Sequence, residues 1–421
     1  YRVVSGEVSE RAELVGLRDA VEMATGERGI ITRSPFENDT LEKVFDPPAV
    51  SHYLVQAGAP DSSARSDSYD PNLDRTPQEE IESTPGFTSA GLQIIPTLGL
   101  SVGHDNNITL ASENEISSMF YVISPAVRVE MPSDNSVFSI TGAADFTRYQ
   151  DSPIDDKVYW YLRGQWAWDV STRQDVNLFG QYSEGSDRRG EGRGQGDSGL
   201  VPLDPDEWQR WDIGGQWDYG AVGASGRLSL EGGASDLTYT NNRDPEGGFS
   251  GTRKLDRDWW FWGGTFYWRV APKTSVLVDY RYTDINYKLS DDSNSVEQSY
   301  MAGVTWDATA RTSGTIKYGY LTKDFDDPER SDYDGPTWAA SIDWRPRTYS
   351  VFTLAGSMQT QEPEGNGDYI LRRDVTLSWV HAWATRFSTS VDVGVGKDEY
   401  RPRQRTDDLF YCCLLYTSPS P

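Results

Sequence analysis

From about residue 91 onward, apolar and polar residues alternate with a period of two, and this pattern restarts roughly every two dozen residues. In an extended chain, successive side chains point to opposite faces. The run at residues 210–219 shows the separation: Arg210, Asp212, Gly214, Gln216 and Asp218 fall on one face, and Trp211, Ile213, Gly215, Trp217 and Tyr219 fall on the other. The pattern predicts β-strands that have one apolar and one polar face.

The apolar faces carry Trp and Tyr, concentrated near strand ends. A soluble β-sandwich can also alternate, but aromatic residues at one strand end after another are typical of the girdles of a membrane barrel, where amphipathic rings lie at headgroup level. We therefore expect an outer-membrane barrel, with outer-membrane lipid as its surroundings. The girdle candidates are Trp160, Trp168, Trp211, Trp217, Tyr219, Trp260, Trp268, Tyr282, Trp306, Trp338 and Trp344.

About fifteen strand patterns follow residue 91, and their connections alternate between short and long. Short periplasmic turns and longer outer loops are the rule for such barrels, and the first connection is long, so the chain should enter the barrel from the periplasm. Bacterial barrels have an even number of strands, so a further, closing strand should begin at about residues 408–411. The prediction is an all-β, transmembrane, antiparallel up-and-down β-barrel of about sixteen strands whose last strand is truncated.

Composition narrows the class of protein further. Only 37% of the 421 residues are hydrophobic, the mean hydropathy is -0.62, and no apolar run approaches the length that a membrane helix needs. Low hydropathy suits a barrel, because only alternate residues meet lipid. The net charge of -26 argues against a nucleic-acid partner, whose phosphates would be repelled.

The chain divides into three parts. Residues 1–90 form a predicted periplasmic leader, with a short helix at 8–23 and a mostly disordered stretch at 57–87 that is poor in apolar residues. A small plug or interaction segment is the alternative for this leader. Residues 91–411 form the predicted barrel. Residues 412–421 resemble translated sequencing-adapter read-through and enter no functional argument.

Two segments carry a family resemblance. Residues 91–108 read GLQIIPTLGLSVGHDNNI, and residues 123–129 read ISPAVRV. They resemble the first strand and loop, and the second strand, of the putative β-barrel porin 2 family, most clearly over residues 91–170. The resemblance implies an outer-membrane protein of the kind found beside exopolysaccharide and capsule genes, with polysaccharide or its export machinery as partners. It carries over no catalytic residue.

The polar faces supply the candidate pore lining: Arg128, Arg163, Arg210, Asp212, Arg227, Asp279, Arg281, Lys317, Asp343 and Arg372. Two interpretations are open for these charges. They can neutralise one another across neighbouring strands, or they can line a hydrated pore that meets anionic or sugar solutes together with inward aromatic residues. Both can hold at different heights of the barrel.

Other motifs are weaker. His104 beside Asp105 lacks the Gly-x-Ser-x-Gly elbow of a rim hydrolase. The acidic loop at 324–334 does not have the spacing of an EF-hand, and the Gly-rich run at 190–196 does not open a helix as a phosphate loop would. We therefore expect no catalytic residue, no metal and no cofactor.

These observations predict a passive porin-like channel or an accessory of exopolysaccharide export. The first alternative is a non-conducting structural barrel whose acidic loops bind surface glycans or cations. The second is a barrel-rim hydrolase. The sequence specifies neither the solute nor the oligomeric state.

Overall fold

The computed structural model describes residues 87–417, except residues 90, 106, 110–114, 190–201, 222–223, 245–250, 310, 348, 364–366, 385–386 and 403–404. Residues 1–86 of the predicted leader, with its helix at 8–23, and the whole Gly-rich run at 190–196 lie outside the described residues, whereas residues 87–89 of the leader form a short strand. In the part of the chain that is described, no helix is long and apolar enough to cross a membrane.

Seventeen strands make up the fold, and the first of them, β1, is only three residues long. The others bear out the prediction of about sixteen barrel strands. Their bounds are β1 Phe87–Ser89, β2 Leu92–Asp105, β3 Ser118–Ser133, β4 Ser136–Tyr149, β5 Lys157–Ser171, β6 Gln174–Ser186, β7 Glu207–Tyr219, β8 Gly226–Tyr239, β9 Arg257–Ala271, β10 Thr274–Tyr287, β11 Ser295–Thr309, β12 Thr312–Phe325, β13 Tyr333–Arg347, β14 Ser350–Gln361, β15 Tyr369–Ala384, β16 Phe387–Arg401 and β17 Thr406–Thr417.

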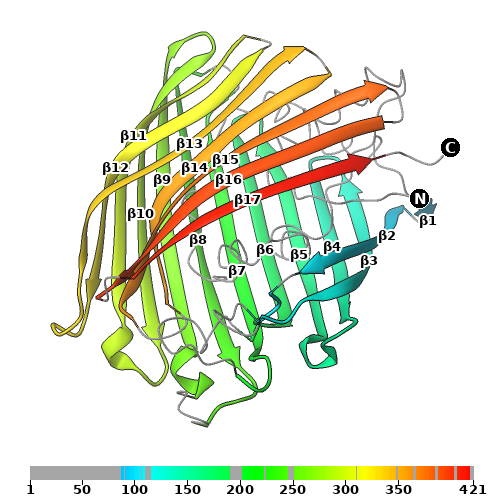
Figure 1. Cartoon of the computed structure of the whole chain (residues 1–421). Helices are drawn as coiled ribbons and strands as arrows, with labels where there is room; N and C mark the ends of the chain where they lie inside the picture. The colour runs from blue at the N-terminus through cyan, green and yellow to red at the C-terminus, as the bar shows by residue number, and fades with distance from the viewer. Residues whose placement is uncertain are drawn as a thin grey trace.

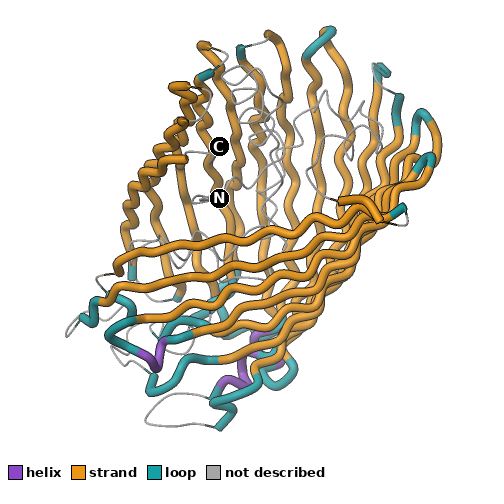
Figure 2. The backbone as a smooth tube through the Cα atoms, turned by 90° about the vertical axis from the view of Figure 1, so that its right-hand side faces the viewer, coloured by secondary structure: helices purple, strands orange, loops and turns teal. Residues whose placement is uncertain are grey.

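Each strand from β2 to β17 pairs antiparallel with the next in the chain. Figures 1 and 2 show that this sheet is strongly curved. The paired registers run from β2 to β17, and no register joins these two strands within the described residues, so they form the two edges of the curved sheet. The fold is the predicted all-β, up-and-down barrel.

The connections alternate as the sequence indicates. Tight turns follow β3, β5, β9, β11, β13 and β15, whereas long loops follow the even-numbered strands from β2 to β14. Three of the long loops contain a 3-10 helix: η3 Pro153–Asp155, η5 Thr252–Leu255 and η6 Asp291–Ser293. We call the two ends of the barrel the long-loop end and the short-turn end.

The edge of β2 is partly covered at the short-turn end. Gly91 has a φ of 80°, a left-handed conformation that favours glycine, and it turns the chain so that β1 pairs with β2 from Phe87↔Ile94 to Ser89↔Leu92. The last strand, β17, pairs with β16 from Glu399↔Thr406 to Ser388↔Thr417. The predicted read-through residues up to Thr417 are therefore part of a paired strand, and their origin stays a prediction.

Candidate functional site: the inner face of the barrel

The two faces of the sheet differ in burial. In β3, for example, exposed residues such as Tyr121 and Ile123 alternate with buried ones such as Val122 and Ser124. Directly paired residues share a face, so the registers extend this assignment from strand to strand. We call the face of Val122 and Ser124 the inner face and the face of Tyr121 and Ile123 the outer face.

The registers place all ten candidate charged residues on the inner face. For example, Thr141↔Arg163, Gln181↔Asp212 and Thr265↔Asp279 are direct pairs within it. The set comprises Arg128, Arg163, Arg210, Asp212, Arg227, Asp279, Arg281, Lys317, Asp343 and Arg372. A role in lining a conducting pore stays a prediction, because position alone does not demonstrate conduction.

The eleven girdle candidates all lie on the outer face, and they form two belts. One belt follows the long-loop end with Trp160, Trp211, Trp260, Tyr282 and Trp338, and the other follows the short-turn end with Trp168, Trp217, Tyr219, Trp268, Trp306 and Trp344. Trp160 and Trp168 are eight positions apart, as are Trp260 and Trp268. At about 3.3 Å per residue, that separation is about 26 Å along a strand.

Most inner-face arginines are held in ion pairs. Arg281 lies 2.7 Å from Glu231, and Arg210 lies 2.7 Å from Asp212, which also accepts a hydrogen bond from Ser235. Such pairs remove the net charge that would otherwise repel or attract solutes, so this part of the inner face follows the neutralising interpretation.

Three further pairs extend the pattern around the barrel. The pairs are Arg128 with Glu130, Arg345 with Asp343, and Arg372 with Asp398. The last pair is almost fully buried and bidentate, with distances of 2.8 and 2.6 Å, and it joins directly paired positions of β15 and β16. Of the other candidates, Asp279 accepts a hydrogen bond from Thr265, and Lys317 is buried.

Two candidate arginines stack on aromatic rings instead. The guanidinium carbon of Arg163 lies 4.7 Å from the ring centre of Phe179, and that of Arg227 lies 4.2 Å from the ring centre of Tyr267. A stacked guanidinium keeps its N–H edge available for hydrogen bonds. Neither Arg163 nor Arg227 makes an ion pair with a described residue.

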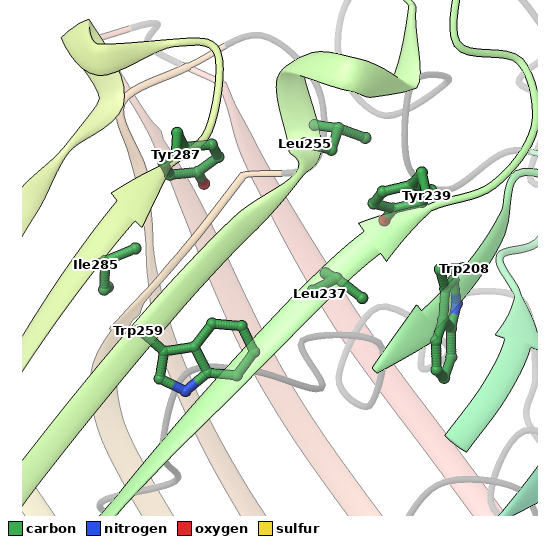
Figure 3. Packing of buried hydrophobic residues seen from close by; sticks show 7 residues of the cluster. All are labelled: Trp208, Leu237, Tyr239, Leu255, Trp259, Ile285 and Tyr287. Atoms are coloured by element: carbon green, nitrogen blue, oxygen red, sulfur yellow. The ribbon is translucent and has the colours of Figure 1, made fainter. Parts of the chain in front are cut away.

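Part of the inner face at the long-loop end is apolar, which the sequence analysis did not anticipate. Figure 3 shows a cluster formed by β7, β8, β9, β10 and η5, whose residues are Trp208, Leu237, Tyr239, Leu255, Trp259, Ile285 and Tyr287. Strand parity could have revealed it, since Trp259 and Trp260 are adjacent and must point to opposite faces.

A buried charged network lies beside this cluster. Glu362, in the loop after β14, accepts hydrogen bonds from Lys323 of β12 and from Tyr287 of β10. Burial by itself would raise the pKa of Glu362, but the attraction and hydrogen bond of Lys323 outweigh it and hold that pKa below its ordinary value. The loop thus reaches inward across several strands.

A second loop folds inward beside β2 and β6. Arg188, just after β6, lies 2.5 Å from Asp105 at the end of β2, and both side chains are buried. Arg189 binds Asp155 of η3, and this hydrogen bond raises the pKa of the Arg189 guanidinium. Loops from distant strands are therefore connected at the long-loop end.

The weaker motifs form no reactive site among the described residues. His104 and Asp105 occupy consecutive strand positions and so point to opposite faces. His381 lies on the outer face, 4.2 Å from Trp383 between ring centres. In the acidic loop, Asp332 and Asp327 accept hydrogen bonds from backbone amides. Within the described ranges, no three His, Cys, Asp or Glu residues are placed to hold a metal ion.

Residues 86–413 match the family described as Putative beta-barrel porin 2. The chain belongs to this porin family. The match confirms the resemblance, supports an outer-membrane location, and extends from β1 into β17. No curated protein matches the sequence significantly.

Solved outer-membrane structures resemble this porin-family chain only distantly. The FrpB iron transporter from Neisseria meningitidis is 9% identical with a TM-score of 0.42, and the alignment covers 78% of this chain and 59% of the transporter. The siderophore receptor PirA from Acinetobacter baumannii is 9% identical with a TM-score of 0.41, covering 80% and 59%. A bacterial polysaccharide outer membrane secretin is 11% identical with a TM-score of 0.37, covering 77% and 99%. The chain thus spans about three fifths of the length of the transporter and the receptor.

Proposed function

We propose that this porin-family barrel is a passive channel of the Gram-negative outer membrane for hydrophilic solutes, with saccharides as the solute class and polysaccharide export as its setting. The observation that carries the proposal is the inner face between the two belts, where charged, amide and hydroxyl side chains replace the apolar residues of the outer face. Polar groups that face a hollow can hydrate it and guide solutes.

The alternating loops support the orientation of the channel. Short turns on one side and long loops on the other correspond to the periplasmic and outer sides of bacterial barrels. The family resemblance supports a role in polysaccharide export, since the barrels that it implies are found beside exopolysaccharide and capsule genes. A downhill concentration gradient or a partner would drive the solute.

The test is planar-bilayer conductance of the purified, refolded barrel. We expect discrete current steps in symmetric salt, and heat-modifiable migration on a gel supplies the control for folding. Folded barrel that inserts without any current would exclude a channel.

A second candidate is a non-conducting structural barrel. It is favoured by the inward loops at the long-loop end, where the contacts of Arg188 with Asp105 and of Lys323 with Glu362 connect loops across strands. The same conductance measurement separates the two candidates. An open channel requires that these loops leave a hydrated path beside the aromatic cluster.

A further inference from the structure

One patch of the inner face contains an arginine that forms no ion pair with a described residue. It consists of Arg163 and Gln165 on β5, Thr141 on β4, and Phe179 and Gln181 on β6, and we call it the Arg163 patch. Arg163 is directly paired with Thr141 on one side and with Gln181 on the other, and Gln165 is paired with Phe179. All of its polar neighbours are therefore uncharged.

The acids on the neighbouring strands are already engaged. In the row of Arg163, Gln181 is paired with Asp212 of β7, which is bound by Arg210 at 2.7 Å and by Ser235 at 2.6 Å. On the other side, Thr141 is paired with Arg128, and Glu130, which lies in the row of Gln165, is bound by that arginine at 2.5 Å. Within the described residues, Arg163 therefore keeps a positive charge that no carboxylate neutralises.

The position of the guanidinium is fixed by stacking. The Phe179 ring lies against the backbone of Gly214, because a Cβ added at that glycine would come within 2.8 Å of the ring. Any side chain at Gly214 would displace the ring, so the glycine lets Phe179 lie close to the sheet. Arg163 then packs on this ring, which holds its planar group in place. Its Nε is buried without a hydrogen-bond partner, so its two terminal Nη groups are the donors that stay available.

We propose that the Arg163 patch is a subsite for an acidic saccharide. The guanidinium of Arg163 would bind a carboxylate through paired N–H donors, the geometry in which arginine binds carboxylates best. Gln165, Gln181 and Thr141 provide amide and hydroxyl groups that both donate and accept hydrogen bonds, as the hydroxyl groups of a sugar ring require. The inference rests on the proposed channel function and specifies that its saccharide solute is negatively charged.

Arg281 shows why this position differs from other stacked arginines. It also packs on a phenylalanine, with 4.2 Å between its guanidinium carbon and the ring centre of Phe261, but its N–H group is taken by Glu231. Both arginines stack on a phenylalanine, but Arg281 also forms an internal ion pair, whereas Arg163 does not.

The experiment compares an oligogalacturonate of defined length with a neutral malto-oligosaccharide of the same length. Each is titrated against single-channel current and, separately, against the detergent-purified barrel by calorimetry. We expect the acidic oligosaccharide to block the current and to bind. R163Q should weaken that affinity about tenfold or more, because a charge-assisted hydrogen bond is lost. The neutral oligosaccharide should bind weakly and should not distinguish R163Q from wild type.

Two variants control the result. R148Q removes an arginine from the outer face of the neighbouring strand β4, where the side chain is 56% exposed, and should leave the affinity for the acidic probe unchanged. R163K keeps the charge but loses the paired donors, and should weaken binding severalfold. If R163Q fails to fold, R163K alone decides the question.

Equal affinity of R163Q and wild type, or equal affinity for the acidic and neutral probes, would overturn the subsite. Absence of binding to wild type would do the same. The two proposals fail separately: a conducting barrel without Arg163-dependent binding retains the channel and loses the subsite, whereas Arg163-dependent binding in calorimetry without conductance retains the subsite and excludes the channel.

Discussion

The inner face has two regions of opposite character. At the long-loop end, Trp259 and Tyr239 are buried in an aromatic cluster, and Lys323 is buried against Glu362. Between the belts, Arg163 and Arg281 are only partly buried on a polar surface. The comparison shows that facing the hollow does not by itself mean facing water, since inward loops convert one part of the inner face into a packed core.

The largest effect should come from placing a charged side chain on the outer face. Ile213, 61% exposed on the outer face of β7, lies between the two belts, so I213R places a charge in the lipid and should cost about 2–4 kcal/mol or prevent folding. Q216R, on the inner face of the same strand, should fold. The measurement is the yield of heat-modifiable barrel after refolding into vesicles. Comparable yields for both variants would show that the register of β7 is wrong.

The next effect concerns the packed region. K323A leaves Glu362 buried without its cation and should lower the free energy of unfolding by about 3–5 kcal/mol, because an uncompensated buried charge is costly. K397A removes a lysine whose side chain is 45% exposed beside Glu399 and should cost about 0–1 kcal/mol. Urea titration of both variants in lipid checks the difference. Similar midpoints would mean that the inward loop does not stabilise the barrel.

The smallest effect concerns the polar region. The double variant R210A/R281A removes two of the ion-paired arginines and leaves the negative charges of Asp212 and Glu231 without their cations. The reversal potential across a salt gradient should therefore shift toward cation selectivity. High salt should reduce the shift by screening. Adding D212N and E231Q should restore the original value. A reversal potential that is unchanged throughout would place these ion pairs outside the conducting path.

The two regions also differ in how well the sequence predicts them. Alternation identifies the faces correctly in β5, where Trp160, Leu162 and Trp166 lie outside and Arg163 lies inside, because the two-residue period is a local property of an extended strand. Turns are equally local, and tight turns follow β3, β5 and β9 in the expected alternation of short and long connections.

The packed region escaped prediction because it depends on contacts between distant residues. Glu362 and Tyr287 are 75 residues apart, and Arg188 and Asp105 are 83 residues apart. No periodicity in the sequence reports such contacts, since they arise only when the curled sheet brings the loops together. The same holds for the partners of the inner charges: alternation predicts that Arg163 and Arg281 face inward, but not that only Arg281 meets a carboxylate.

The spacing of the two aromatic belts has a consequence for where the barrel can reside. Strands of membrane barrels tilt by about 35–45°, so about 26 Å along a strand corresponds to a hydrocarbon layer of roughly 20 Å. The bacterial outer membrane is thinner than average, and each ångström of mismatch in a thicker bilayer costs a fraction of a kcal/mol. We therefore expect the paired tryptophans at 160 and 168, and at 260 and 268, to favour residence in a thin membrane over a thick one.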